Sequence, residues 1–218
     1  MFIKLNNTEL YYEATGEGTP VILLHGNGED HNIFDVLIGQ LSEKFRVYAI
    51  DSRGHGQSGK SDNLNYQLMA EDIIGFIHEN NIEKPILYGF SDGGIIGLMI
   101  AYMQPRLLSK LIVSGANSSP SGLKFKWRFL IWLSYLFTRT AKLKMMLKEP
   151  QISNTDLQKI EIPVLVTAGE NDMIKKSDTM FIAGNIKKSQ LMILSGEKHE
   201  SYVINSPKLF EVIKDFID

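Results

Sequence analysis

The 218-residue sequence contains no cysteine. This absence excludes disulfide bonds, metal sites with thiolate ligands and a cysteine nucleophile. The sequence also lacks an excess of positive charge, because its formal net charge is −2. A nucleic-acid-binding domain is usually basic, so nucleic acid is not expected as a partner.

Long hydrophobic runs are missing as well. The most apolar segment, residues 129–137, is far shorter than the roughly 20 residues that a transmembrane helix needs. Residues 1–6 lack the charged start and apolar run of a secretory signal. A hydrophobic content of 44% and a charged content of 22% are ordinary for a globular protein. We therefore expect a single cytoplasmic domain over residues 1–218, without a transmembrane segment.

Charge is unevenly distributed along the chain. No acidic residue occurs between Asp92 and Glu149. Nine basic residues fall in that interval: Arg106, Lys110, Lys124, Lys126, Arg128, Arg139, Lys142, Lys144 and Lys148. The remainder of the chain is therefore strongly acidic.

Short apolar segments alternate with helical patterns. The apolar segments are 21–24, 47–50, 86–88, 111–113, 164–166 and 191–194, and such segments are typical of buried parallel strands. Helices are predicted over about 66–79, after Ser91 and over about 207–217. Residues 2–14, with Asn6-Asn7 at their centre, predict an antiparallel hairpin at the sheet edge. The pattern indicates a doubly wound α/β fold, whose active sites lie at the carboxyl ends of the strands.

Residues 118–152 interrupt this alternation. They are helical in composition and rich in aromatic and basic residues, and we expect a small helical cap inserted over the carboxyl edge of the sheet. Packing of this cap onto the core would account for most of its aromatic residues. An aromatic cap would also suit an apolar acyl group, with Phe90, Trp127, Phe129 and Trp132 as candidate pocket residues.

Ser91 is the candidate nucleophile. It is the central residue of G-F-S-D-G (89–93), which follows the expected strand 86–88 and precedes a helical pattern. Such a strand-to-helix turn exposes the hydroxyl, and its glycines relieve crowding. The helix N-terminus behind it favours developing negative charge. The alternative role for this serine is a simple helix cap.

A serine hydroxyl needs a general base, and the sequence offers five histidines. His199 follows the last expected strand, which places it on a loop at the carboxyl edge. His25 and His55 lie in turn-like segments before the nucleophile, and His78 lies in an amphipathic helix. Position therefore favours His199.

Asp172 is the candidate acid that orients the histidine. It lies just beyond the expected strand 164–166, and its alternative role is an N-cap for a following helix. Glu170 is the main competitor. The order Ser91, Asp172, His199 is the order expected of this type of nucleophile turn.

The oxyanion of the reaction also needs donors. The backbone N–H of Asp92 is one candidate, because it directly follows Ser91. The second is the backbone N–H of Asn27, in the H-G-N-G segment (25–28) after the strand 21–24. The alternative role for this segment is a strand-ending turn.

Together these motifs resemble the α/β-hydrolase superfamily along nearly the whole chain. G-F-S-D-G-G (89–94), G-E-N-D (169–172) and E-K-H (197–199) resemble its nucleophile, acid and base segments. D-S-R-G-H-G-Q-S (51–58) resembles a characteristic turn, in which Asp51, Arg53 and His55 would be structural. The resemblance implies an esterase-like branch with a short cap and an open pocket. The serine argues against the dehalogenase and epoxide-hydrolase branches, which use an aspartate nucleophile.

The sequence thus predicts hydrolysis of a small carboxylic ester or thioester through an acyl-enzyme intermediate, without a metal or organic cofactor. Three alternatives remain open. One is a ligand-binding protein of low turnover on the same fold. Another is hydrolysis of a carbon–carbon or amide bond. In the third, the basic and aromatic cap lies on an anionic membrane surface.

Overall fold

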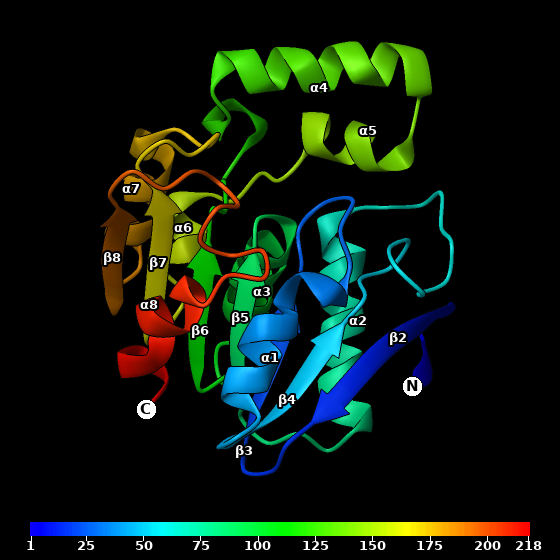
Figure 1. Cartoon of the computed structure of the whole chain (residues 1–218). Coiled ribbons are helices and arrows are strands. Elements are labelled where there is room, and N and C mark those ends of the chain that lie inside the picture. The colour runs from blue at the N-terminus through cyan, green and yellow to red at the C-terminus, as the bar shows by residue number, and fades with distance from the viewer.

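The computed structural model describes residues 1–218 and contains one eight-stranded sheet, with strand order β1-β2-β4-β3-β5-β6-β7-β8 (Figure 1). The strands are β1 (Phe2–Leu5), β2 (Thr8–Thr15), β3 (Thr19–Leu24), β4 (Phe45–Ile50), β5 (Ile86–Phe90), β6 (Lys110–Ser114), β7 (Val164–Gly169) and β8 (Ser189–Leu194). Strands β3 to β8 are parallel, and β1 and β2 form an antiparallel hairpin at one edge. The predicted α/β-hydrolase fold class is therefore confirmed.

Helices cover both faces of the sheet. They are α1 (Asp35–Leu41), α2 (Tyr66–Glu79), α3 (Asp92–Met103), α4 (Phe125–Thr138), α5 (Ala141–Lys148), α6 (Asn154–Leu157), α7 (Lys176–Asn185) and α8 (Lys208–Ile217). A cluster of 19 buried residues includes side chains of α1 and α8 on one face. A cluster of 32 includes those of α2, α3, α6 and α7 on the other. These two cores fix the sheet as a rigid platform.

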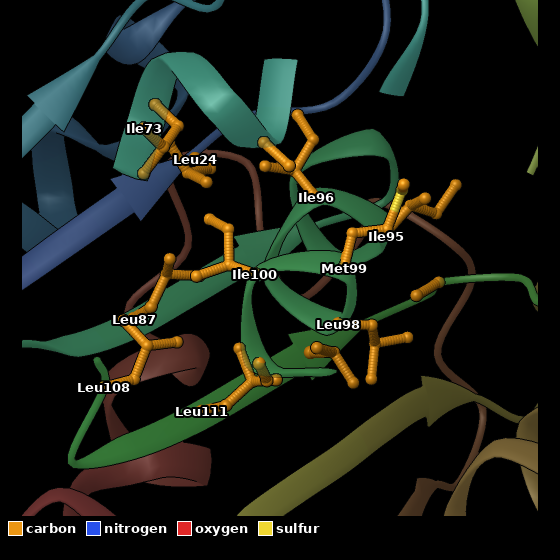
Figure 2. Packing of buried hydrophobic residues seen from close by; sticks show 14 of the residues in the cluster. Leu24, Ile73, Leu87, Ile95, Ile96, Leu98, Met99, Ile100, Leu108 and Leu111 are labelled. Atoms are coloured by element: carbon orange, nitrogen blue, oxygen red, sulfur yellow. The ribbon is translucent and has the colours of Figure 1, made fainter. Parts of the chain in front are cut away.

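Helix α3 has apolar residues around its whole circumference, and ten of its twelve residues are buried. Figure 2 shows its residues Ile96 and Ile100 among Ile73 of α2, Leu87 of β5 and Leu111 of β6. Burying side chains of this size stabilises the fold by roughly 1.5–3 kcal/mol each. The helix that follows Ser91 is therefore held firmly, and with it the turn that carries the serine.

The D-S-R-G-H-G-Q-S segment forms a buried polar network. Asp51 accepts hydrogen bonds from the backbone N–H and the Nδ1 of His31 and from the backbone N–H of Gln57. Arg53 donates two hydrogen bonds to the carboxylate of Asp72 on α2. These contacts satisfy buried charges that would otherwise be costly, and they join the loop after β4 to helix α2.

The segment 118–152 leaves the sheet after β6 and returns before β7. It contains the 3₁₀ turn η2 (Pro120–Gly122) and helices α4 and α5. Figure 1 shows α4 and α5 beyond the carboxyl ends of the strands, with α5 between α4 and the rest of the molecule. None of the helices combines the length and the apolar character needed to cross a bilayer.

The expectation that the aromatic residues pack this segment onto the core is wrong. Helix α4 has no buried residue, and the side chains of Phe125 and Phe137 are 81% and 82% exposed. The physical reason is the position of α5, which occupies the layer beneath α4. Most of the circumference of α4 therefore faces outward.

Candidate active site

Ser91 lies in the turn between β5 and α3 with φ 51° and ψ −112°. A positive φ is strained for any residue with a side chain, so the surroundings must hold it. The N–H of Ser91 donates to the carbonyl of Ser114 on β6 (2.8 Å), and its carbonyl accepts from Ile95 of α3 (3.1 Å). Both neighbours of the turn thus fix the serine at the carboxyl edge of the sheet.

Two glycines make this turn possible. A Cβ on Gly89 would lie 2.2 Å from the carbonyl oxygen of Gly93, and a Cβ on Gly93 would lie 2.1 Å from the carbonyl oxygen of Leu24. Both contacts are with backbone, which cannot move aside. The glycines of G-F-S-D-G therefore have a packing reason beyond their conformational freedom.

His199 and Asp172 lie in line with Ser91. The Nε2 of His199 is 3.1 Å from Ser91 Oγ, and its Nδ1 is 2.7 Å from Asp172 Oδ1. Because an ionised carboxylate only accepts hydrogen bonds, Nδ1 donates and Nε2 is left to accept from the serine hydroxyl. The three residues come from loops after β5, β7 and β8, which are separate in the sequence.

Asp172 is buried and also accepts from the N–H of Ile174 (2.9 Å). Helix α7 begins only at Lys176, so Asp172 orders a turn and does not cap a helix. The competitor Glu170 points elsewhere, because it accepts hydrogen bonds from Ser195 and from the N–H of Gly196. The hydrogen bond from the Gly196 N–H is the main cause of a lowered pKa of Glu170, and the bond from Ser195 adds to it. Both bonds also hold the loop that precedes His199.

Gly115 was not singled out by the sequence, yet the imidazole packs directly against it. It has φ 63°, and a Cβ at this position would lie 2.7 Å from Cε1 and 2.8 Å from Nδ1 of His199. The residue after β6 must therefore lack a side chain for His199 to reach Ser91. The S-G pair at 114–115 is the only sequence signal of this requirement.

The candidate oxyanion donors lie on adjacent segments. The side-chain Nδ2 of Asn27 donates to Asp92 Oδ2 (2.9 Å), and the N–H of Gly93 donates to the carbonyl of His25 (3.1 Å). The backbone N–H groups of Asn27 and Asp92 have no protein acceptor. Both are thus available for a ligand beside Ser91.

The carboxyl group of Asp92 is buried under this pair. It accepts from the hydroxyl of Tyr66 on α2 (2.8 Å) as well as from Asn27. Burial raises the pKa of Asp92, although the two hydrogen bonds from Asn27 and Tyr66 lower it in part. Lys142 of α5 is half-buried and lies within electrostatic range of Asp92, and burial lowers its pKa. Neither Tyr66 nor Lys142 could be assigned to this cluster from the sequence.

Glu29 is a further titratable group beside the nucleophile. Its Oε2 accepts from the N–H of Gly26 (2.9 Å). A Cβ built on Gly26 would lie 2.7 Å from that oxygen and 3.2 Å from Cβ of Ser91, so all three residues meet. Burial raises the pKa of Glu29 to about 7, partly offset by the Gly26 N–H and by His199. Its charge therefore changes near neutral pH.

The other buried histidines have structural contacts. Nε2 of His25 accepts from the N–H of Ser52 (3.0 Å), and its Nδ1 lies 2.8 Å from the carbonyl oxygen of Gly26. Burial lowers the pKa of His25, and it lowers that of His55 to about 4. Both are neutral at physiological pH, and neither has a hydrogen bond to Ser91.

The structure brings only one of the four candidate pocket residues to the triad. The ring centroid of Phe90 is 4.9 Å from that of His199. Phe129 and Trp132 instead line a cavity of about 460 Å³ with Phe125, Arg128 and Leu147, and no triad residue lines it. Trp127 is exposed on α4. The structure contains no group of three His, Asp or Glu side chains able to hold a metal ion.

The chain is similar to known proteins over part or all of its length. A family model described as "alpha/beta hydrolase fold" matches residues 19–144. A putative esterase/lipase of Haemophilus influenzae is 41% identical over 118 residues, which are 54% of this chain and 41% of that protein. Human "Serine hydrolase BPHL" is 26% identical, with 99% of this chain and 85% of that protein aligned.

Solved structures align over the whole chain. The esterase EaEST from Exiguobacterium antarcticum aligns with a TM-score of 0.86 at 22% identity, covering 99% of this chain and 98% of that one. The enol-lactonase from Burkholderia xenovorans aligns with a TM-score of 0.83 at 18% identity, covering 100% and 99%. The match of the family model to more than half of the chain shows that this protein is a member of the α/β-hydrolase fold family.

Proposed function

We propose that this protein hydrolyses a carboxylic ester or thioester through an acyl-enzyme intermediate, with Ser91 as the nucleophile. The observation that carries the proposal is the hydrogen-bonded line from Ser91 Oγ to His199 (3.1 Å) and from His199 to Asp172 (2.7 Å). Several relatives are named esterases or lipases, which supports an ester as the substrate.

In the first half-reaction, Ser91 Oγ attacks the carbonyl carbon of the substrate while His199 Nε2 takes the hydroxyl proton. Asp172 holds the imidazole in the tautomer with Nδ1 protonated and stabilises its charged form. The negative oxygen of the tetrahedral intermediate accepts from the N–H groups of Asn27 and Asp92. Each such donor contributes on the order of 3 kcal/mol to transition-state stabilisation.

The intermediate then expels its leaving group. His199 returns the proton to the departing alcohol or thiol, and the acyl group stays on Ser91. Water enters, His199 takes one of its protons, and the hydroxide attacks the acyl carbon. The second tetrahedral intermediate collapses, His199 returns its proton to Ser91 Oγ, and the acid is released. One ester bond and one water are consumed, and no cofactor takes part in any step.

A fluorophosphonate probe tests the assignment of the nucleophile. We expect it to label the wild type and to leave Ser91→Ala unlabelled, because the probe reacts with an activated serine. Ser61→Ala, which removes a partly exposed serine, is the matched control and is expected to label like the wild type. Equal labelling of the Ser91→Ala protein would contradict the proposal.

A panel of p-nitrophenyl esters of increasing acyl length tests the reaction. Turnover that disappears in Ser91→Ala supports ester hydrolysis and narrows the acyl group. Labelling without turnover on any ester would favour a different scissile bond, since one fold supports several chemistries. If the protein is not labelled and hydrolyses no ester, a binding protein is favoured.

A further inference from the structure

Helix α4 presents large apolar side chains outward along its entire length. Phe125, Phe137, Phe129, Trp132 and Trp127 are between 40% and 82% exposed, and no residue of the helix is buried. Folded proteins rarely expose contiguous apolar surface beyond a few hundred Å² without an interaction partner. The question is therefore what covers α4.

The charge around the helix selects an anionic partner. The interval between Asp92 and Glu149 contains nine basic residues and no acidic one. Lys124, Lys126, Arg128 and Arg139 lie on or next to α4, and the last three are exposed. The remainder of the chain is strongly acidic, because the total formal charge is only −2.

A second copy of this chain fits that surface poorly. A twofold-symmetric dimer brings the same patch of both copies together. Contact through α4 would therefore place two sets of exposed cations against each other without an acidic residue from the same segment to neutralise them. Like charges in an interface cost several kcal/mol.

A lipid surface fits it well. Amphipathic helices that lie in a membrane interface combine Trp, Phe and Leu with Lys and Arg. Trp rings prefer the headgroup level, and long basic side chains extend toward the phosphates. Helix α4 has 14 residues, fewer than the roughly 20 that span a bilayer. It can lie in the interface without crossing it.

We propose that α4 is a membrane-docking helix, which inserts its aromatic residues into the headgroup boundary of an anionic lipid bilayer. Phe125, Phe129 and Trp132 of α4 also line the apolar cavity of about 460 Å³ between α4 and α5, in which Arg128 is the one charged lining residue. Figure 1 shows α4 beyond the carboxyl ends of the strands. Docking through α4 thus places the end of the sheet that carries Ser91 toward the lipid.

The protein has a built-in probe for this contact. Its two tryptophans, Trp127 and Trp132, both lie on α4, so tryptophan fluorescence reports on this helix alone. We expect an emission blue shift with phosphatidylcholine vesicles that contain phosphatidylglycerol, and quenching when their acyl chains are brominated. Pure phosphatidylcholine is expected to give a much smaller shift. High salt should weaken binding because it screens the basic residues.

Two variants separate the apolar and the basic contributions in a vesicle sedimentation assay. Phe125→Ser with Phe137→Ser is expected to lower the vesicle-bound partition at least tenfold, whereas the control Phe2→Ser, at an exposed phenylalanine of β1, leaves it unchanged. Lys126→Glu with Arg128→Glu should lower it by a similar factor. Its control is Lys187→Glu with Lys188→Glu, a change of two exposed lysines after α7.

Circular dichroism of every variant verifies folding. Ser91→Ala is expected to bind vesicles like the wild type, because docking does not depend on catalysis, so the two proposals can fail separately. Absence of binding to anionic vesicles would overturn the membrane-docking proposal. So would a lipid-independent dimer, measured by light scattering, that the Phe125→Ser, Phe137→Ser variant dissociates.

Discussion

The surroundings of Ser91 and helix α4 differ in how firmly their side chains are packed. At the carboxyl edge of the sheet, Ser91, His199 and Asp172 are held by backbone hydrogen bonds, close-packed glycines and the hydrogen bonds between their own side chains. Helix α4 has no buried side chain and packs chiefly on α5. Catalytic geometry requires rigid support, whereas a surface that meets a lipid needs exposed groups. The difference indicates that the proposed reaction and the proposed membrane contact depend on separate parts of the protein.

The comparison predicts the largest loss at the triad. Asp172→Asn leaves the shape of the site intact but offers an amide that can hold His199 in the wrong tautomer. We expect kcat to fall on the order of 10⁴-fold, with little change in the free energy of unfolding. Steady-state hydrolysis of a p-nitrophenyl ester measures it. The control Asp215→Asn, on α8, should keep full activity, and an active Asp172→Asn protein would contradict the assignment.

The next largest loss of activity is expected at Gly115, which packs against the imidazole of His199. Gly115→Ala places a methyl group where the ring of His199 lies, and the left-handed backbone at Gly115 adds strain. We expect kcat/KM to fall on the order of 10²-fold, the loss that a displacement of about 1 Å can cause in a reacting group. Gly184→Ala is the matched control, because an added Cβ there meets no atom within 4 Å. Equal activities of the two variants would disprove the steric role of Gly115.

The carboxyl group of Glu29, beside Ser91, is expected to make folding stability depend on pH. Burial raises its pKa from 4.5 to about 7, so the folded chain keeps a proton that the unfolded chain releases above pH 4.5. Folding stability therefore decreases as pH rises through this window and levels off above about pH 7. Glu29→Gln abolishes this loss, which we expect to be on the order of 2 kcal/mol after allowing for partial solvent screening.

Urea unfolding at about pH 5 and about pH 8 measures the effect. The stability difference between wild type and Glu29→Gln should shift in favour of the variant at the higher pH. Glu79→Gln, which changes an exposed residue of α2, is expected to follow the wild type. A pH-independent difference between wild type and Glu29→Gln would show that Glu29 titrates normally.

The smallest effect is expected on α4. Leu133 is 36% exposed there, so Leu133→Ala should lower the free energy of unfolding by less than about 1 kcal/mol. The same substitution at Leu98 of α3, which is fully buried, should cost about 2–5 kcal/mol. Denaturant melts of both proteins measure the contrast. Similar losses would mean that α4 is covered by other parts of the chain.

Much of the fold was accessible from the sequence because local signals coincide there. Apolar segments bounded by turns predicted the parallel strands, and the helix over 66–79 has the bounds of α2. The order of Ser91, Asp172 and His199 followed from strand ends, since parallel strands bring their carboxyl ends to one edge. The structure places the three side chains in contact, and their catalytic roles stay predictions.

What the sequence did not reveal depends on contacts between distant segments. The need for glycine at 115 arises only when the loop after β8 folds over β6. The raised pKa of Glu29 comes from burial, which no local pattern encodes. The outward aromatic residues of α4 were misplaced because a run of large apolar residues does not itself indicate whether another part of the chain covers them.

The separation of charge along the chain has a further consequence for kinetics. Seven of the basic residues, from Lys124 to Lys148, lie on or beside α4 and α5 without an acidic residue between them, whereas the remainder of the chain is acidic. We expect this separation to give the molecule an electric dipole moment. In the field of a negatively charged surface this dipole rotates the protein before contact, so that α4 arrives first. Ionic strength should therefore change the association rate more than the dissociation rate. The protein would meet such a surface already oriented, rather than searching for its orientation after arrival.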